Sequence, residues 1–212
     1  MPIRLASAEG LLQRELGAAA DCEAIRDGIL GQPVNSATTI AFLAAAIVVG
    51  RHPDRRLVAW GLAATGAGSW LFHGPMVPGS TWAHDVGLAW LLVIVAADQT
   101  RWSRWAGLPA LAGLSVVLTV APAVSEAGFV VLSAAAVGGV LWRDRSRATI
   151  VAMALLGIAA AVGRLSATGN PLCRPESWLQ GHGFWHLASA AAVTLWAVLG
   201  RRPRRSPRRE LA

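Results

Sequence analysis

Residues 148–165 read ATIVAMALLGIAAAVGRL, an apolar run whose one charged side chain is Arg164. A helix needs about 20 such residues to cross roughly 30 Å of hydrocarbon, so the run is typical of a transmembrane helix. Comparable apolar runs occupy residues 35–50, 57–73, 82–98, 105–122, 124–142 and 181–199. The sequence therefore predicts an all-α integral membrane protein, built as a bundle of seven transmembrane helices.

The composition of the chain favours the same class of protein. Hydrophobic residues make up 54% of the 212 positions, charged residues make up 15%, and the mean hydropathy is +0.48. A soluble domain of this size carries more charge. We expect an external N-terminal segment (1–34), one seven-helix domain (35–200) and a basic cytoplasmic tail (201–212) without ordered structure.

The arginines predict the orientation of the bundle. The chain has no lysine, and 14 of its 19 arginines follow the first, third, fifth and seventh apolar runs. Because basic residues collect on the cytoplasmic side, the N-terminus is expected outside and the C-terminus in the cytoplasm. Abundant alanine and arginine beside absent lysine and tyrosine are typical of GC-rich bacterial coding. We therefore expect a multi-pass protein of a bacterial inner membrane.

The net charge of +7 does not indicate a nucleic-acid partner. Much of the excess lies in the run RRPRRSPRR at 201–209, directly after the last apolar run. Membrane topology and anionic lipid headgroups account for such a run. The bilayer is the expected partner, and no obligate protein partner is evident.

Three histidines and one aspartate interrupt the apolar runs at one depth. They lie in SWLFH at 69–73, at Asp85, and in HGFWH at 182–186. The predicted orientation places all four in the outer half of the membrane, where ionisable side chains by default mark a functional site. Residues four apart share one helix face, so His182 and His186 can meet His73 at one point.

Three imidazoles plus one open position form a zinc site of the catalytic type, where the pKa of bound water falls to about 7. Asp85 is expected to orient the water or to take its proton, and Ser69 to donate to a developing oxyanion. Helix packing is the alternative for Ser69, and a helix N-terminal carboxylate is the alternative for Asp85. His84 lies about 100° around the helix from Asp85, so we expect an interfacial residue.

These residues resemble the alkaline ceramidase family of the CREST superfamily. The order Ser-x-x-x-His, Asp, His-x-x-x-His in seven helices is shared across that superfamily. Cys22-Glu23, followed by GQPVN at 31–35, is similar to bacterial ceramidase-like members. The resemblance covers nearly the whole chain.

The resemblance implies an intramembrane zinc amidase that hydrolyses the N-acyl bond of ceramide or a related membrane lipid. His73, His182 and His186 would bind Zn²⁺, while Ser69 and Asp85 would be catalytic. One alternative is a non-enzymatic CREST protein, receptor-like or haemolysin-III-like, with a structural zinc. A weaker alternative is an intramembrane serine protease that uses Ser69.

Eukaryotic members of the family also bind calcium in the outer N-terminal segment. The corresponding residues here would be Asp21, Glu23, Asp27 and Asn35. Gln32 stands where the family has a glutamate, and Ca²⁺ prefers several charged oxygens. The alternative to a calcium site is a polar cap held by hydrogen bonds of Glu23 and Asn35.

The two cysteines, Cys22 and Cys173, both fall on the outer side in this topology. Disulfides persist in oxidising compartments such as the periplasm. We therefore predict a Cys22–Cys173 bridge that holds the N-terminal segment over the mouth of the site.

Overall fold

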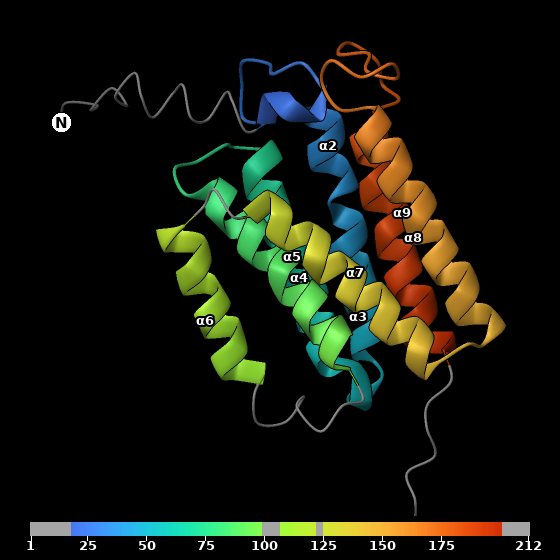
Figure 1. Cartoon of the computed structure of the whole chain (residues 1–212). Coiled ribbons are helices and arrows are strands. Elements are labelled where there is room, and N and C mark those ends of the chain that lie inside the picture. Colours follow the sequence, from blue (N-terminus) through green and yellow to red (C-terminus); the bar gives the residue numbers. More distant parts are fainter. Residues whose placement is uncertain (1–17, 99–106, 122–124, 201–212) are drawn as a thin grey trace, which may run out of the picture.

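The computed structural model describes residues 18–98, 107–121 and 125–200, and these fold into seven helices with no strand (Figure 1). The first helix consists of two consecutive pieces, α2 and α3, that meet at Thr39. The helices are α2 (Pro33–Thr38), α3 (Ile40–Gly50), α4 (Arg56–His73), α5 (Ser80–Ala97), α6 (Gly107–Val120), α7 (Ser125–Arg143), α8 (Arg147–Leu165) and α9 (Gly181–Leu199). Two short 3-10 helices, Ala19–Asp21 and Pro53–Arg55, precede α2 and α4.

These helices occupy the seven apolar runs of the sequence. Three of them are long and apolar enough to cross a membrane, namely Pro33–Gly50, Ser80–Ala97 and Arg147–Leu165, and two shorter apolar helices lie at Gly107–Val120 and Ala127–Arg143. Helices α4 and α9, of 18 and 19 residues, are equally long but are not among these three. The predicted tail (201–212) and Arg101 and Arg104 lie outside the described residues.

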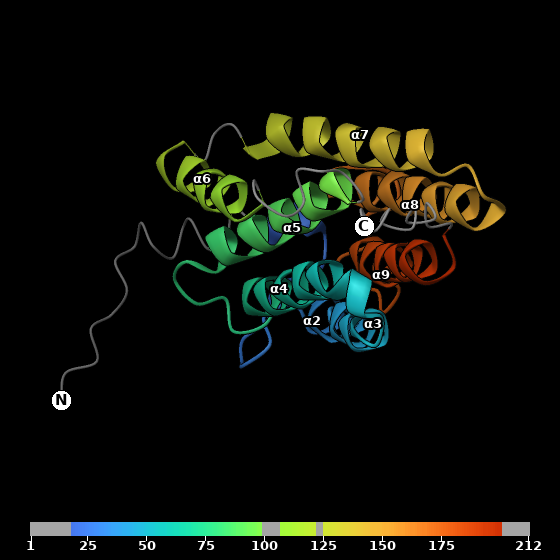
Figure 2. The ribbon, with the colours of Figure 1, turned by 90° about the horizontal axis from the view of Figure 1, so that it is seen from below.

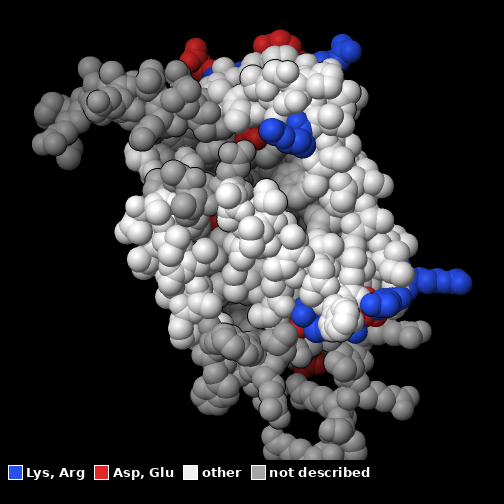
Figure 3. Space-filling model, in the orientation of Figure 1, with Lys and Arg blue, Asp and Glu red and all other residues white. Residues whose placement is uncertain are grey.

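The bundle has small residues inside and large apolar residues outside. Apart from Ala18, nine of the buried core residues are alanines. By contrast, Trp60, Val130 and Trp142 are 69–80% exposed. This is the pattern of membrane bundles, in which small residues let helix backbones approach and large side chains face lipid. Figure 3 shows most of the charged side chains of this face near its two ends, with a broad uncharged belt between them.

Helix α4 lies between α3 and α5, and α9 packs on α8 and α3 (Figure 2). The contact between α4 and α5 is close because two glycines lie in it. A Cβ atom at Gly68 would come within 2.3 Å of the Ala83 carbonyl oxygen, and one at Gly87 within 2.6 Å of the Ala64 carbonyl oxygen. Glycine at these two positions therefore sets the distance between the end of α4 and the start of α5.

The two ends of the bundle differ in chemistry. At one end, residues 18–32 and the loop from α8 to α9 lie side by side above the helices (Figure 1). At the other end, the buried Arg55 pairs with Asp98, donates from Nε to the Ala197 carbonyl at 3.1 Å, and stacks 4.9 Å from the Trp196 ring centroid. The histidines lie at the first of these ends.

Candidate metal centre

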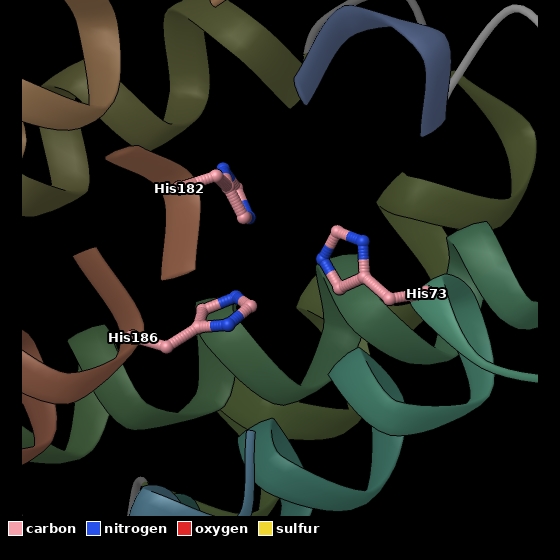
Figure 4. Close-up of side chains that lie close together, drawn as sticks. All are labelled: His73, His182 and His186. Atoms are coloured by element: carbon pink, nitrogen blue, oxygen red, sulfur yellow. The ribbon is translucent and has the colours of Figure 1, made fainter. Parts of the chain in front are cut away.

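His73, His182 and His186 lie close together, with their rings directed toward one another (Figure 4). Each offers a ring nitrogen, and these nitrogens lie within 4.8 Å of one another. The ring centroids are 4.6–5.2 Å apart, and the side chains of His73 and His186 are buried. In residues 18–98, 107–121 and 125–200, no other cluster of His, Cys, Asp or Glu is compact enough to hold a metal ion.

Local sequence explains why the three side chains converge. His73 is the last residue of α4, and Gly74 ends that helix. His182 and His186 lie one turn apart at the start of α9, so both point to the same side. Between them, Gly183 lets α2 approach, because a Cβ atom there would come within 3.3 Å of the Thr38 side chain.

The Nδ1 atom of each histidine faces a partner in the N-terminal part of the chain. Nδ1 of His73 is 2.6 Å from Oε1 of Gln32, and Nδ1 of His186 is 3.0 Å from the Thr38 hydroxyl. Nδ1 of His182 is 3.1 Å from Oδ1 of Asp21. Metal-binding histidines characteristically donate a hydrogen bond from the N–H of their second ring nitrogen to such a partner, which orients the ring and selects the tautomer.

The Nε2 atoms behave differently from the Nδ1 atoms. Nε2 of His73 and Nε2 of His182 are buried and have no hydrogen-bond partner. Nε2 of His186 is 3.2 Å from the Ser69 hydroxyl oxygen. Buried polar atoms are nearly always paired. The two unpaired Nε2 atoms, with Nε2 of His186 beside them, therefore indicate a binding site for a ligand. The donor set fits a metal ion that accepts imidazole nitrogens.

Ser69 and Asp85, which the sequence analysis assigns to the same site, are placed differently. Ser69 is buried beside His186. Asp85 is partly exposed, and its Oδ1 atom is 3.0 Å from Nδ1 of His84. Within the described part of the chain it pairs with His84 and with none of the three clustered histidines.

The structure places His84 beside the cluster, where the sequence predicts only an interfacial residue. Its ring centroid is 4.9 Å from that of Phe72 and 6.2 Å from that of His73. The angle of a residue around its own helix does not say which neighbouring helix lies nearest to it. The close contact of α4 and α5 at Gly68 brings His84 against the end of α4.

The residues considered for calcium do not gather into one site. Asp21 faces His182, and the Glu23 carboxylate accepts the backbone N–H groups of Val34 at 2.8 Å and Asn35 at 2.7 Å. These bonds form a polar cap on α2. Asp27 is exposed, and no metal cluster in the described residues includes these carboxylates.

Cys22 and Cys173 form a disulfide, with Cα atoms 5.5 Å apart. Hydrogen bonds strengthen the connection between the two segments. The Thr168 N–H donates to the Ala20 carbonyl at 2.9 Å, and the Ala24 N–H donates to the Pro175 carbonyl at 3.0 Å. The N-terminal segment is therefore attached to the α8–α9 loop directly above the histidines.

Sequence reasoning missed the roles of Gln32 and Thr38. Gln32 was noted only as a substitute for a calcium ligand, and Thr38 only as part of the first apolar run. The available signal was the density of polar residues at 32–39, which is unusual at the start of an apolar helix.

Searches for similar protein-family models, curated proteins and solved structures found no match. What the structure itself shows in the described residues is a buried cluster of three histidines that could hold a metal ion. The cluster lies in a helical protein with several apolar helices.

Proposed function

We propose that the protein is an intramembrane zinc-dependent hydrolase that cleaves the N-acyl amide bond of ceramide or of a related N-acylated membrane lipid. The observation that carries the proposal is the set of three buried imidazoles with a serine hydroxyl beside them and an apolar cavity below. This combination offers metal ligands and a hydrogen-bond donor, and Phe42, whose ring lies beside that of His186, lines a cavity with room for a hydrocarbon chain.

The ligand set favours zinc in a catalytic arrangement. Three histidine nitrogens without a thiolate leave one coordination position for water or substrate, whereas structural zinc sites are usually closed by four protein ligands. When bound, zinc supplies a Lewis acid and makes hydroxide available near neutral pH.

Two side chains would then assist the reaction. The Ser69 hydroxyl would donate a hydrogen bond to the oxygen of the amide carbonyl as negative charge develops on it. Asp85 would accept a proton from the attacking water, and His84 would hold the Asp85 carboxylate through their 3.0 Å contact.

The cavity supports an acyl-chain substrate. It has a volume of about 220 Å³, is lined by α3, α5, α7, α8 and α9, and has no charged residue in its lining. It begins near His186, where Phe42 lies with its ring centroid 5.8 Å from the His186 ring. It extends along α9 from Trp185 to Trp196, which is about 16 Å of helix. Such apolar walls suit a hydrocarbon chain.

The arginine distribution supports the proposed orientation. With the N-terminus outside and the C-terminus in the cytoplasm, the histidines lie toward the periplasmic side of a bacterial inner membrane. The disulfide Cys22–Cys173 lies at the same end of the molecule, which agrees with an oxidising compartment.

One observation favours the non-enzymatic alternative with a structural metal. The Asp85 carboxylate, the proposed base, pairs with His84 rather than lying within the cluster. A receptor-like or haemolysin-III-like protein would need the metal only to hold α4 and α9 together.

Metal content and fatty-acid release from a ceramide-containing lipid mixture separate the two proposals. We expect the purified protein to carry one zinc and to release fatty acid, and His182→Ala to lose both. His52→Ala is the matched control, because His52 precedes the 3-10 helix at Pro53–Arg55 and lies outside the cluster. Equal release by the wild type and His182→Ala would refute the hydrolase, and zinc without release would favour the structural metal.

A further inference from the structure

All three Nδ1 partners of the clustered histidines come from one short stretch of chain. Asp21, Gln32 and Thr38 lie within residues 18–38, which we call the cover segment, whereas the histidines belong to α4 and α9. Figure 1 shows this segment above and beside the start of α9. The orientation of every ligand therefore depends on an element that supplies none of them.

Gln32 is the most constrained of the three partners. Its amide nitrogen donates to the carbonyl oxygens of Ala18 at 2.7 Å and Glu23 at 2.8 Å. These two acceptors decide which way the amide faces, so Oε1 points at His73. An amide oxygen only accepts, and Nδ1 of His73 must therefore carry the proton and leave the Nε2 lone pair free.

The same reasoning applies to the other two histidines. The single hydroxyl proton of Thr38 is directed at the backbone carbonyls of Val34 and Asn35, both at 2.9 Å, so the hydroxyl accepts from Nδ1 of His186. The Oδ1 atom of the Asp21 carboxylate accepts a hydrogen bond, and Nδ1–H of His182 donates to it. All three rings therefore present Nε2 to the centre.

The cover segment is itself held in place by bonds to the site. The Gln32 N–H donates to the His73 carbonyl at 2.8 Å, and the Gly31 N–H donates to the Gly74 carbonyl at 2.9 Å. Cys22, next to Asp21, is joined to the α8–α9 loop by the disulfide. Gln32 is thus attached to His73 through both its backbone and its side chain.

We propose that Asp21, Gln32 and Thr38 are positioning residues, and that the cover segment sets the metal affinity of the cluster by holding each histidine in its metal-binding tautomer. The proposal rests on the proposed metal site but not on hydrolysis. Removing an outer partner of this kind typically lowers metal affinity about 10- to 100-fold.

Two adjacent threonines provide a matched test. The hydroxyl of the partly buried Thr38 contacts His186, whereas the hydroxyl of the fully buried Thr39 donates only to the Ser36 carbonyl at 2.8 Å. Zinc affinity is measured by chelator competition on the full-length protein, and the absorption spectrum of the Co²⁺-loaded protein reports ligand geometry. We expect Thr38→Val to bind zinc about 10- to 100-fold more weakly with an altered Co²⁺ spectrum, Thr38→Ser to restore both, and Thr39→Val to resemble the wild type.

Thermal unfolding distinguishes positioning from general stability. Without metal, Thr38→Val and Thr39→Val should have similar Tm values, while the rise in Tm on adding zinc should shrink only for Thr38→Val. If Thr38→Val does not fold, the same comparison can be made between Asp21→Ala and Asp21→Asn. The asparagine oxygen still accepts a hydrogen bond from His182, so only Asp21→Ala should weaken zinc binding. Unchanged affinity in Thr38→Val and Asp21→Ala, or an equal loss in Thr39→Val, would overturn the proposal.

The outcome for the wild type separates this proposal from the proposed function. A wild-type protein that binds neither zinc nor cobalt overturns both. A wild-type protein that binds zinc but releases no fatty acid overturns the hydrolase alone, and the affinity differences among the Thr38 variants still test the cover segment.

Discussion

The Ser69 hydroxyl oxygen lies 3.2 Å from Nε2 of His186, although the two residues are 117 positions apart and belong to α4 and α9. Ser69 is one turn before His73, so a single face of α4 supplies both a histidine of the cluster and a hydroxyl directed at another one. The serine is therefore positioned at the point where the two histidine-bearing helices meet.

Ser69→Ala should separate metal binding from catalysis. The substitution removes a donor to the developing oxyanion but no metal ligand, so we expect stoichiometric zinc and a fall in fatty-acid release of about 100- to 1,000-fold. Ser115→Ala is the control, because the Ser115 hydroxyl bonds within α6, to the Leu111 carbonyl, and meets Trp90 away from the cluster. Loss of zinc together with activity would show that Ser69 has a structural role.

The apolar cavity should determine how long an acyl chain the protein accepts. Ala136 of α7 is buried and lines the cavity, whereas its neighbour Ala135 is exposed. Ala136→Phe should fill the cavity and reduce hydrolysis of long-chain ceramides more than short-chain ones, with zinc content unchanged. Ala135→Phe should leave chain-length preference as in the wild type. An identical chain-length profile in both variants would mean that the acyl chain binds elsewhere.

The disulfide should contribute to both stability and metal binding. It closes a loop of 151 residues, and bridges of this kind typically stabilise a protein by about 2–4 kcal/mol. Cys173→Ser should lower the Tm and also weaken zinc binding, because Asp21 adjoins Cys22. The measurements are thermal unfolding with and without reductant and chelator competition. A reductant-dependent shift in gel mobility that persists in Cys173→Ser would contradict this pairing.

Arg55 should be a determinant of stability at the opposite end of the bundle. Its side chain is 2% exposed and pairs with Asp98, so its removal leaves a carboxylate without its ion-pair partner and typically costs about 3–5 kcal/mol. Arg55→Ala should therefore lower the midpoint of chemical unfolding strongly, while Arg56→Ala, at an exposed neighbour, should change it little. Equal shifts in the two variants would show that the buried pair contributes nothing specific.

Much of the helical architecture could be predicted from the sequence. The run at 148–165 became Arg147–Leu165, and the run at 181–199 became Gly181–Leu199. Helix formation in an apolar run depends on local hydrogen bonds and hydrophobicity, which are properties of neighbouring residues. The meeting of His73 with His182 and His186 was also predictable, because helix ends and four-residue spacing place the three at one depth.

The outer partners of the histidines could not be predicted in this way. Gln32 meets His73 across 41 positions, and Asp21 meets His182 across 161. Neither spacing is periodic, because both contacts depend on how residues 18–38 fold back over the bundle. The closeness of His84 to His73 was not predicted for the same reason, since the angle of His84 around α5 does not reveal that Gly68 brings α4 so close. Periodicity thus locates ligands on their own helices, while the atoms that orient those ligands are chosen by packing between distant segments.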